Sequence, residues 1–149
     1  MATQIRLQAD LKEFLRLLGS NNVEYLLIGG YAVGYYGYPR PTGDLDVWIA
    51  MSPENAERVV NALKEFSFDA SPELFLNENS VVRMGVLPFR FQILTTIDGV
   101  DFRECYRARN TVVIDDVEVN LISLRDLRRN KNASGRLKDL SDVENLPNE

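Results

Sequence analysis

Two aspartates, Asp44 and Asp46, are the residues whose type and spacing could do chemistry. They lie two positions apart in the alternating segment Asp-Leu-Asp-Val-Trp-Ile, residues 44–49. On a strand, such side chains leave the same face, with Cα atoms roughly 6.5 Å apart. Two like charges this close repel each other, and a divalent cation between them removes the repulsion. Because Mg²⁺ favours carboxylates that it shares with substrate phosphates, the pair predicts a magnesium site.

The segment before this pair carries residue types that suit phosphate. Gly29 and Gly30 close a short apolar run, and residues 31–37 are expected to form a short helix. Glycine permits close backbone approach, and a helix N-terminus presents N–H groups to an anion. Arg40 and Thr42 add a guanidinium fork and a hydroxyl. Either half alone more often marks a solvated strand or an ordinary turn, but their order and spacing together favour a functional site.

The periodicity of the chain predicts the elements that position these residues. Apolar residues at helical spacing predict a helix over residues 7–18, and Ser52-Pro53 begins a second helix. Ser123 begins a helical C-terminus, in which residues 137–146 continue an apolar face. Six segments read as strands, the last two joined as a hairpin: residues 25–28, 44–49, 80–85, 89–97, 111–114 and 117–122. The pattern predicts an α+β fold: a small mixed β-sheet with helices packed mainly on one face.

Composition narrows the chemistry further. The 149 residues fit a single domain, residues 1–149, and include no histidine and one cysteine, Cys105. Imidazole catalysis, His-ligated zinc and intrachain disulfides are therefore excluded, and Cys105 is expected to be a small buried apolar residue. The net charge of −5 argues against a protein that coats nucleic acid or an anionic membrane. The chain has no apolar segment of a signal or membrane span, so we expect a cytoplasmic protein without a membrane partner.

A local basic run contrasts with this acidic balance. Most such runs are solvated helix faces, but beside a phosphate site this one could hold a triphosphate or guide an RNA end. Lys131 is the preferred contact and Arg136 the second. The run contains six basic residues: Arg125, Arg128, Arg129, Lys131, Arg136 and Lys138. Several aromatic residues could stack a base, although core packing explains them at least as well: Tyr31, Tyr35, Tyr36, Tyr38 and Trp48.

The stretch from residue 27 to residue 49 resembles the signature of the nucleotidyltransferase superfamily that includes DNA polymerase β. In that signature, Gly-Gly or Gly-Ser precedes Asp-apolar-Asp-apolar by about a dozen residues. Here Ile28-Gly29-Gly30 precedes Asp44-Leu45-Asp46-Val47, with the lead-in Arg40-Pro-Thr-Gly. The second half resembles small bacterial nucleotidyltransferases related to those of toxin–antitoxin pairs. Its supporting segments are residues 94–102, 122–126 and 130–139.

The resemblance implies a fold, a cofactor and a reaction. Asp44 and Asp46 would hold Mg²⁺ against a nucleoside triphosphate, and Lys131 would approach the triphosphate from the C-terminal helix. Gly29, Gly30, Arg40 and Thr42 would cradle the phosphates. An acceptor hydroxyl would attack the α-phosphorus and displace pyrophosphate, which is mainly a matter of positioning and charge neutralisation. No motif identifies the acceptor, which could be RNA, a protein or a small molecule.

One position departs from the family pattern. Active members carry a third carboxylate on a later strand, and the corresponding residue here is Gln92. Glutamine brings no charge and cannot act as a base; Asp98 or Asp101 could substitute only if the loop that carries them folds back. Three hypotheses follow: a Mg²⁺-dependent nucleotidyltransferase, a degenerate relative that binds nucleotide or a protein partner without turnover, and an interaction protein with only surface charge at Asp44 and Asp46.

Overall fold

A mixed six-stranded sheet forms the centre of the computed structural model, which describes residues 8–38, 43–85 and 90–147. Its strand order is β3-β4-β2-β1-β6-β5. β2 lies parallel to β4 and β1 parallel to β6, whereas the other neighbours are antiparallel. The predicted α+β fold with a mixed sheet is confirmed. The strands are β1 (Tyr25–Ile28), β2 (Asp44–Ile49), β3 (Val81–Met84), β4 (Arg90–Leu94), β5 (Asn110–Ile114) and β6 (Val117–Leu121).

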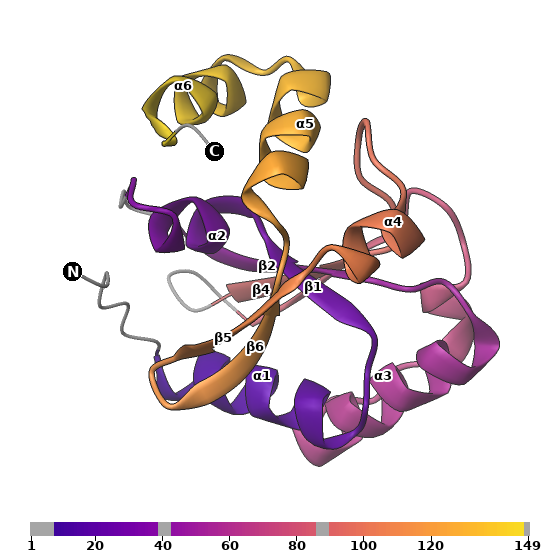
Figure 1. Ribbon diagram of the computed structural model, residues 1–149. Helices are drawn as coiled ribbons and strands as arrows, with labels where there is room; N and C mark the ends of the chain where they lie inside the picture. Colours follow the sequence, from indigo (N-terminus) through magenta and orange to yellow (C-terminus); the bar gives the residue numbers. More distant parts are fainter. Residues whose placement is uncertain (1–7, 39–42, 86–89, 148–149) are drawn as a thin grey trace.

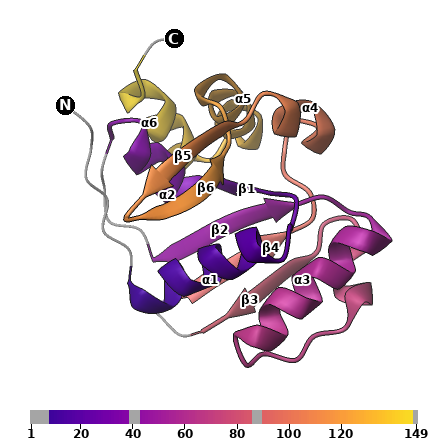
Figure 2. The same ribbon diagram turned by 60° about the horizontal axis from the view of Figure 1, so that its bottom comes forward.

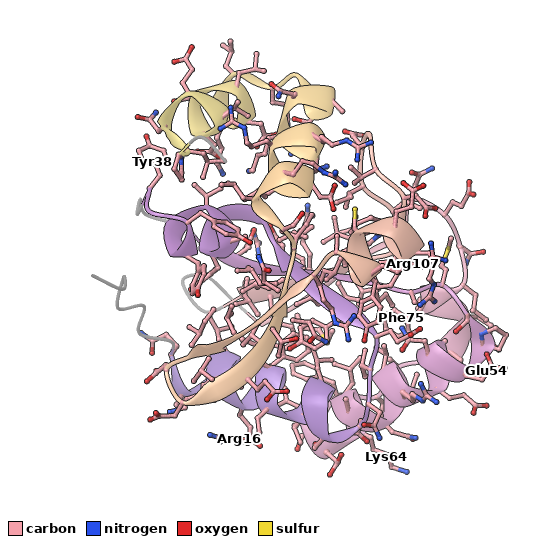
Figure 3. All side chains as sticks on the ribbon, in the orientation of Figure 1. Arg16, Tyr38, Glu54, Lys64, Phe75 and Arg107 are labelled. Atoms are coloured by element: carbon pink, nitrogen blue, oxygen red, sulfur yellow. The ribbon has the colours of Figure 1, made fainter. Side chains whose placement is uncertain are left out.

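The two longest helices, α1 (Ala9–Ser20) and α3 (Pro53–Glu65), cover one face of the sheet (Figure 2). Within the described residues, the predicted stripe of α1 is buried at Leu11, Phe14, Leu15 and Leu18, whereas residue 7 lies outside them. The Phe14 ring stacks on Phe91 of β4 with centroids 4.1 Å apart. Phe75, in the short 3₁₀-helix η1 (Pro72–Phe75), is also fully buried, whereas Glu54 and Lys64 of α3 are exposed (Figure 3). This face therefore carries the main hydrophobic core.

The shorter helices lie on the other side of the sheet (Figure 1). They are α2 (Gly29–Tyr35), α4 (Phe102–Arg107), α5 (Leu124–Ser134) and α6 (Leu137–Asn145). Strand alternation gives Trp48 the same face as Asp44 and Asp46, and its ring packs edge-on against Phe102 of α4. The indole N–H of Trp48 donates to the Thr95 carbonyl, so this residue belongs to the core. The helices that lie around Asp44 and Asp46 on this face are α2, α5 and α6.

Side-chain caps and one turn explain several element boundaries. The hydroxyls of Ser52 and Ser123 accept from the backbone N–H three residues later and begin α3 and α5. The hairpin between β5 and β6 turns at Asp115 and Asp116, both with positive φ, +48° and +68°. That conformation is the one a two-residue hairpin requires, and aspartate tolerates it better than most residues, which is why the turn needs no glycine.

The last helix departs from its predicted orientation. The spacing of Leu137, Leu140 and Val143 predicts a packed apolar face, but Leu137 is 86% exposed and Leu140 38%. Instead, α6 buries Asp139 and Asp142. Their carboxylates pair with a lysine of α5, and that ion pairing outweighs the transfer of a leucine from water. The expectation of an apolar face packed on the protein is therefore wrong for the first half of α6.

Cys105, on α4, is buried as expected. Burial, followed by the nearby Asp126 carboxylate, raises the pKa of its thiol to about 12. Among the described residues, no helix has both the length and the apolar character needed to cross a membrane.

Candidate functional site

A cleft of about 490 Å³ opens between the polar face of β2 and β4 and the helices α5 and α6. Asp44 and Asp46 line one wall, together with Gly29 and Gly30 at the start of α2. The opposite wall contains Lys131 of α5, with Arg136 and Lys138 at the junction to α6. The predicted site residues Gly29, Gly30, Asp44, Asp46 and Lys131 therefore lie around one cleft. Arg40 and Thr42 lie outside the described residues, so their predicted role stays a prediction.

Strand register sets the geometry on the sheet side. Because β2 and β4 are parallel neighbours, Asp44 lies beside Arg90 and Asp46 beside Gln92. The antiparallel pairing of β3 and β4 then places Arg83 next to Gln92. The residues come from three strands but share one face. Gln92 therefore lies directly beside Asp46 on the neighbouring strand.

Hydrogen bonds connect these five side chains into one network. The Gln92 amide nitrogen donates to Asp44 Oδ2 at 3.1 Å and to Asp46 Oδ1 at 2.8 Å. Its carbonyl oxygen accepts from Arg83 Nε at 2.6 Å. Arg90 donates to both oxygens of Asp44, at 2.7 and 3.2 Å. One oxygen of each aspartate is therefore turned towards the same point, where the amide nitrogen now lies.

Asp46 is less easily ionised than an ordinary aspartate. Burial is the largest cause; the bond from Gln92 favours the charged form, and the negative charge of Asp44 opposes it. The balance raises the pKa of Asp46 from 3.8 to about 6. Arg90 pairs with Asp44, whereas the neutral amide does not offset the burial of Asp46, and a cation in the cleft would favour the ionised form of Asp46.

The conformation at Gly29 favours glycine. Its φ is +70°, and a Cβ atom added there would lie 2.5 Å from Asp46 Oδ2. The backbone of α2 is therefore in direct contact with the second aspartate. The group that approaches this glycine is a carboxylate of the chain itself, so the predicted approach of a phosphate stays a prediction.

Lys131 is held within the protein rather than free in the cleft. Its ammonium lies 2.8 Å from Asp139 Oδ1 and 3.0 Å from Asp142 Oδ2, and its side chain is 7% exposed. Asp139 also accepts from Ser134 and from Arg136. Burial opposes ionisation of Asp139, but these donors together lower its pKa to about 2. This Lys131 cluster, made of Lys131, Asp139 and Asp142, fixes α6 on α5.

Internal contacts also account for much of the remaining basic run. Arg125 and Arg129 pair with the buried Asp126, and Arg128 donates to carbonyls at the end of α6. Lys138, by contrast, is an exposed cation that lines the cleft. Within the run, Arg128 and Lys131 therefore connect α5 to α6, Arg125 and Arg129 pair within α5, and Arg136 and Lys138 line the cleft.

The acidic substitutes considered for Gln92 have different places in the structure. Asp98 lines the cleft, and its backbone carbonyl accepts from Asn130 of α5. Asp101 caps α4 by accepting from the Glu104 backbone N–H. Among the residues that the structure describes, no three carboxylate, histidine or cysteine side chains form a group that could hold a metal ion. The acidic pair therefore has no third acidic neighbour in that part of the chain.

None of the aromatic residues considered for base stacking is among the described residues that line the cleft. Trp48 is in the core, and Tyr36 donates to the Ile122 carbonyl. Sequence reasoning missed Arg83, Arg90 and the partners of Lys131. The alternation of β4 puts Arg90 and Gln92 on one face, so the sequence could have shown that these two side chains are neighbours. Their contacts with β2 could not be read in this way, because strand pairing across 46 residues has no local signal.

Comparisons with known proteins bear on the fold. No family model matches the chain, and no curated protein matches it by sequence. Among solved structures, a presumed nucleotidyltransferase from Thermotoga maritima superposes with a TM-score of 0.63 and 15% identity, covering 90% of this chain and 88% of that one. A nucleotidyltransferase-like antigen from Paracoccidioides brasiliensis gives 0.51 and 18%, covering 93% and 76%. At these identities the likeness concerns architecture, and the chain has the nucleotidyltransferase fold.

Proposed function

We propose that the protein is a Mg²⁺-dependent nucleotidyltransferase that binds a nucleoside triphosphate in the cleft and transfers its nucleoside monophosphate to an acceptor hydroxyl. The observation that carries the proposal is the convergence of Asp44 and Asp46. One oxygen of each lies within 3.1 Å of a single atom, the Gln92 amide nitrogen, inside a cleft whose other wall is basic.

The donor set of this pair suits a hard divalent cation. Carboxylate oxygens are the ligands that Mg²⁺ prefers, and the ion is usually shared with substrate phosphates. Asp44 and Asp46 would hold it, and when bound it would neutralise charge on the phosphates. Asp44 is already paired with Arg90, whereas burial raises the pKa of Asp46, whose ionised form a bound cation would favour.

Phosphate groups would lie between the acidic pair and the basic wall. Lys138 and Arg136 line that wall, and the long-range attraction of Lys131 also reaches Asp46. Gly29 and Gly30 leave room for close approach from the α2 side. Arg40 and Thr42 are proposed as further phosphate donors on the strength of the sequence.

The transfer itself balances without a histidine. The oxygen of the acceptor hydroxyl bonds to the α-phosphorus, and the bond from that phosphorus to the bridging oxygen breaks, which releases pyrophosphate. The hydroxyl proton passes to water, because Gln92 cannot accept it. The contribution of the chain is to orient the triphosphate and to shield its charge.

Calorimetric titration with ATP, GTP, CTP and UTP, each with and without Mg²⁺, tests the binding. We expect binding that needs Mg²⁺ and is lost in Asp44→Asn and Asp46→Asn. Asp98→Asn, which changes an exposed aspartate of the same cleft, is the matched control. Binding that survives both substitutions at the acidic pair would refute the site.

A second function is favoured by one specific observation. Gln92 places an amide, rather than a carboxylate, beside the acidic pair, so the protein could bind nucleotide or a protein partner without turnover. Incorporation of label from α-³²P-nucleotides into candidate acceptors distinguishes the two. Activity that is absent in the wild type and gained in Gln92→Asp supports the second function, whereas full activity in the wild type rules it out.

A further inference from the structure

The orientation of the Gln92 amide is fixed by partners on both of its sides. Its nitrogen donates to Asp44 and Asp46, and its oxygen accepts from Arg83 on the edge strand β3. An arginine has no acceptor, and an ionised carboxylate has no donor. Both sets of contacts therefore require the same orientation, with the nitrogen towards the aspartates and the oxygen towards Arg83.

This orientation opposes a cation at the aspartate pair. The N–H end of the amide dipole occupies the point at which the two carboxylate oxygens converge. Rotation of the amide by half a turn would present its carbonyl oxygen to a cation, which is a suitable ligand. The same rotation would turn the N–H₂ group towards Arg83, so that two donors would face each other and a charge-assisted hydrogen bond would be lost.

We propose that Arg83 is a positioning residue that holds the Gln92 amide in its donor orientation and thereby weakens divalent-cation binding at Asp44 and Asp46. The inference rests on the proposed function, because the cation concerned is the one assigned there. It adds that the affinity of the site depends on a residue two strands away from the aspartates.

Titration with Mn²⁺, followed by electron paramagnetic resonance of the free ion, measures this effect without nucleotide or turnover. Arg83→Met removes the donor while keeping an unbranched side chain at an exposed position. We expect Mn²⁺ to bind at least about tenfold more tightly, equivalent to about 1.4 kcal/mol, because the amide is free to rotate. Arg83→Lys, which keeps a charge and a donor, should stay close to the wild type.

A charge control separates the hydrogen bond from simple electrostatics. Lys138→Met removes one positive charge from the same cleft without touching Gln92. We expect it to change Mn²⁺ affinity by less than about threefold, the scale of an exposed charge interaction. Equal effects of Arg83→Met and Lys138→Met, or no effect of Arg83→Met, would overturn the role of Arg83.

The side-chain amide signals of Gln92 give a second readout. These signals are assigned in ¹⁵N-edited NMR spectra by their loss in Gln92→Glu. In a titration with Mg²⁺ alone, we expect them to shift at a lower Mg²⁺ concentration in Arg83→Met than in the wild type. Gln92→Asp serves as the positive control for the cation site. If wild type and Arg83→Met both bind Mn²⁺ with equal affinity, the inference fails and the proposed function stands. If neither of them binds Mn²⁺, the proposed cation site fails as well, whether or not Gln92→Asp binds it.

Discussion

Two clusters on opposite walls of the cleft have the same composition in outline. Each consists of two aspartates that share one nitrogen: Gln92 Nε2 lies between Asp44 and Asp46, and Lys131 Nζ lies between Asp139 and Asp142. The contact distances are similar, between 2.8 and 3.1 Å. The difference is the charge on the nitrogen, which is zero in one cluster and positive in the other.

The two clusters also differ in the pKa of their aspartates. Burial acts against ionisation in both clusters, but the pKa of Asp46 is raised to about 6, whereas that of Asp139 is lowered to about 2. In the Lys131 cluster, the ammonium and the donors from Ser134 and Arg136 outweigh burial. In the Gln92 cluster, Arg90 pairs with Asp44, but the neutral amide does not outweigh the burial of Asp46, whose pKa stays raised. The two clusters therefore differ in how far their donors offset burial.

The largest effect is expected from removing the charge of Lys131. Lys131→Met leaves two buried carboxylates without their shared partner, and breaking such a buried pair typically costs about 3–5 kcal/mol of unfolding free energy. Urea denaturation at pH 7 measures the loss. Lys138→Met is the control, since Lys138 is exposed and its replacement should stay within about 0.5 kcal/mol. A stable Lys131→Met protein would show that α6 does not depend on this ion pair.

A smaller, pH-dependent effect is expected at Asp139. A folded-state pKa of about 2, below the ordinary 3.8, stabilises the folded state above pH 3.8, and this contribution is lost as the pH falls towards 2. Asp139→Asn should therefore be less stable than the wild type by about 2 kcal/mol at pH 7. The gap should narrow below pH 4 and close near pH 2, as urea denaturation at a series of pH values would reveal. A gap that is independent of pH would contradict the assignment.

The smallest expected effect concerns Gly29, the glycine next to the acidic pair. Gly29 and Gly135 have nearly equal φ angles, +70° and +67°, but only Gly29 has a neighbour where a Cβ atom would go. Gly135→Ala should cost about 1 kcal/mol from backbone strain alone. Gly29→Ala should cost about 1 kcal/mol more, since Asp46 must move. Thermal unfolding of both variants measures the difference, and equal losses would mean that Asp46 yields freely.

The sequence predicts most of the acidic wall because its determinants are local. Alternation in residues 44–49 puts Asp44 and Asp46 on one face, and Gly29-Gly30 marks the turn that approaches them. The predicted strands and the caps at Ser52 and Ser123 are local in the same sense. Each depends on residues within a few positions of one another, so periodicity and cap rules suffice.

The basic wall could not be predicted because its determinants are pairings between elements. Leu137 and Leu140 have the spacing of a buried stripe, yet Lys131 turns the helix so that Asp139 and Asp142 face inwards. Similarly, the contact of Gln92 with Arg83 depends on which strands are neighbours in the sheet. Ion pairs and strand order are tertiary choices, which hydrophobic periodicity does not encode.

The state of Cys105 has a practical consequence for spectroscopy. It is the only cysteine of the chain, and a buried thiol with a pKa of about 12 supplies almost no thiolate for alkylation. A cysteine introduced at Leu137, which is 86% exposed on α6, could therefore be labelled selectively with a maleimide dye. Fluorescence from that position would report on the motion of α6 relative to the cleft in the folded, unmodified background.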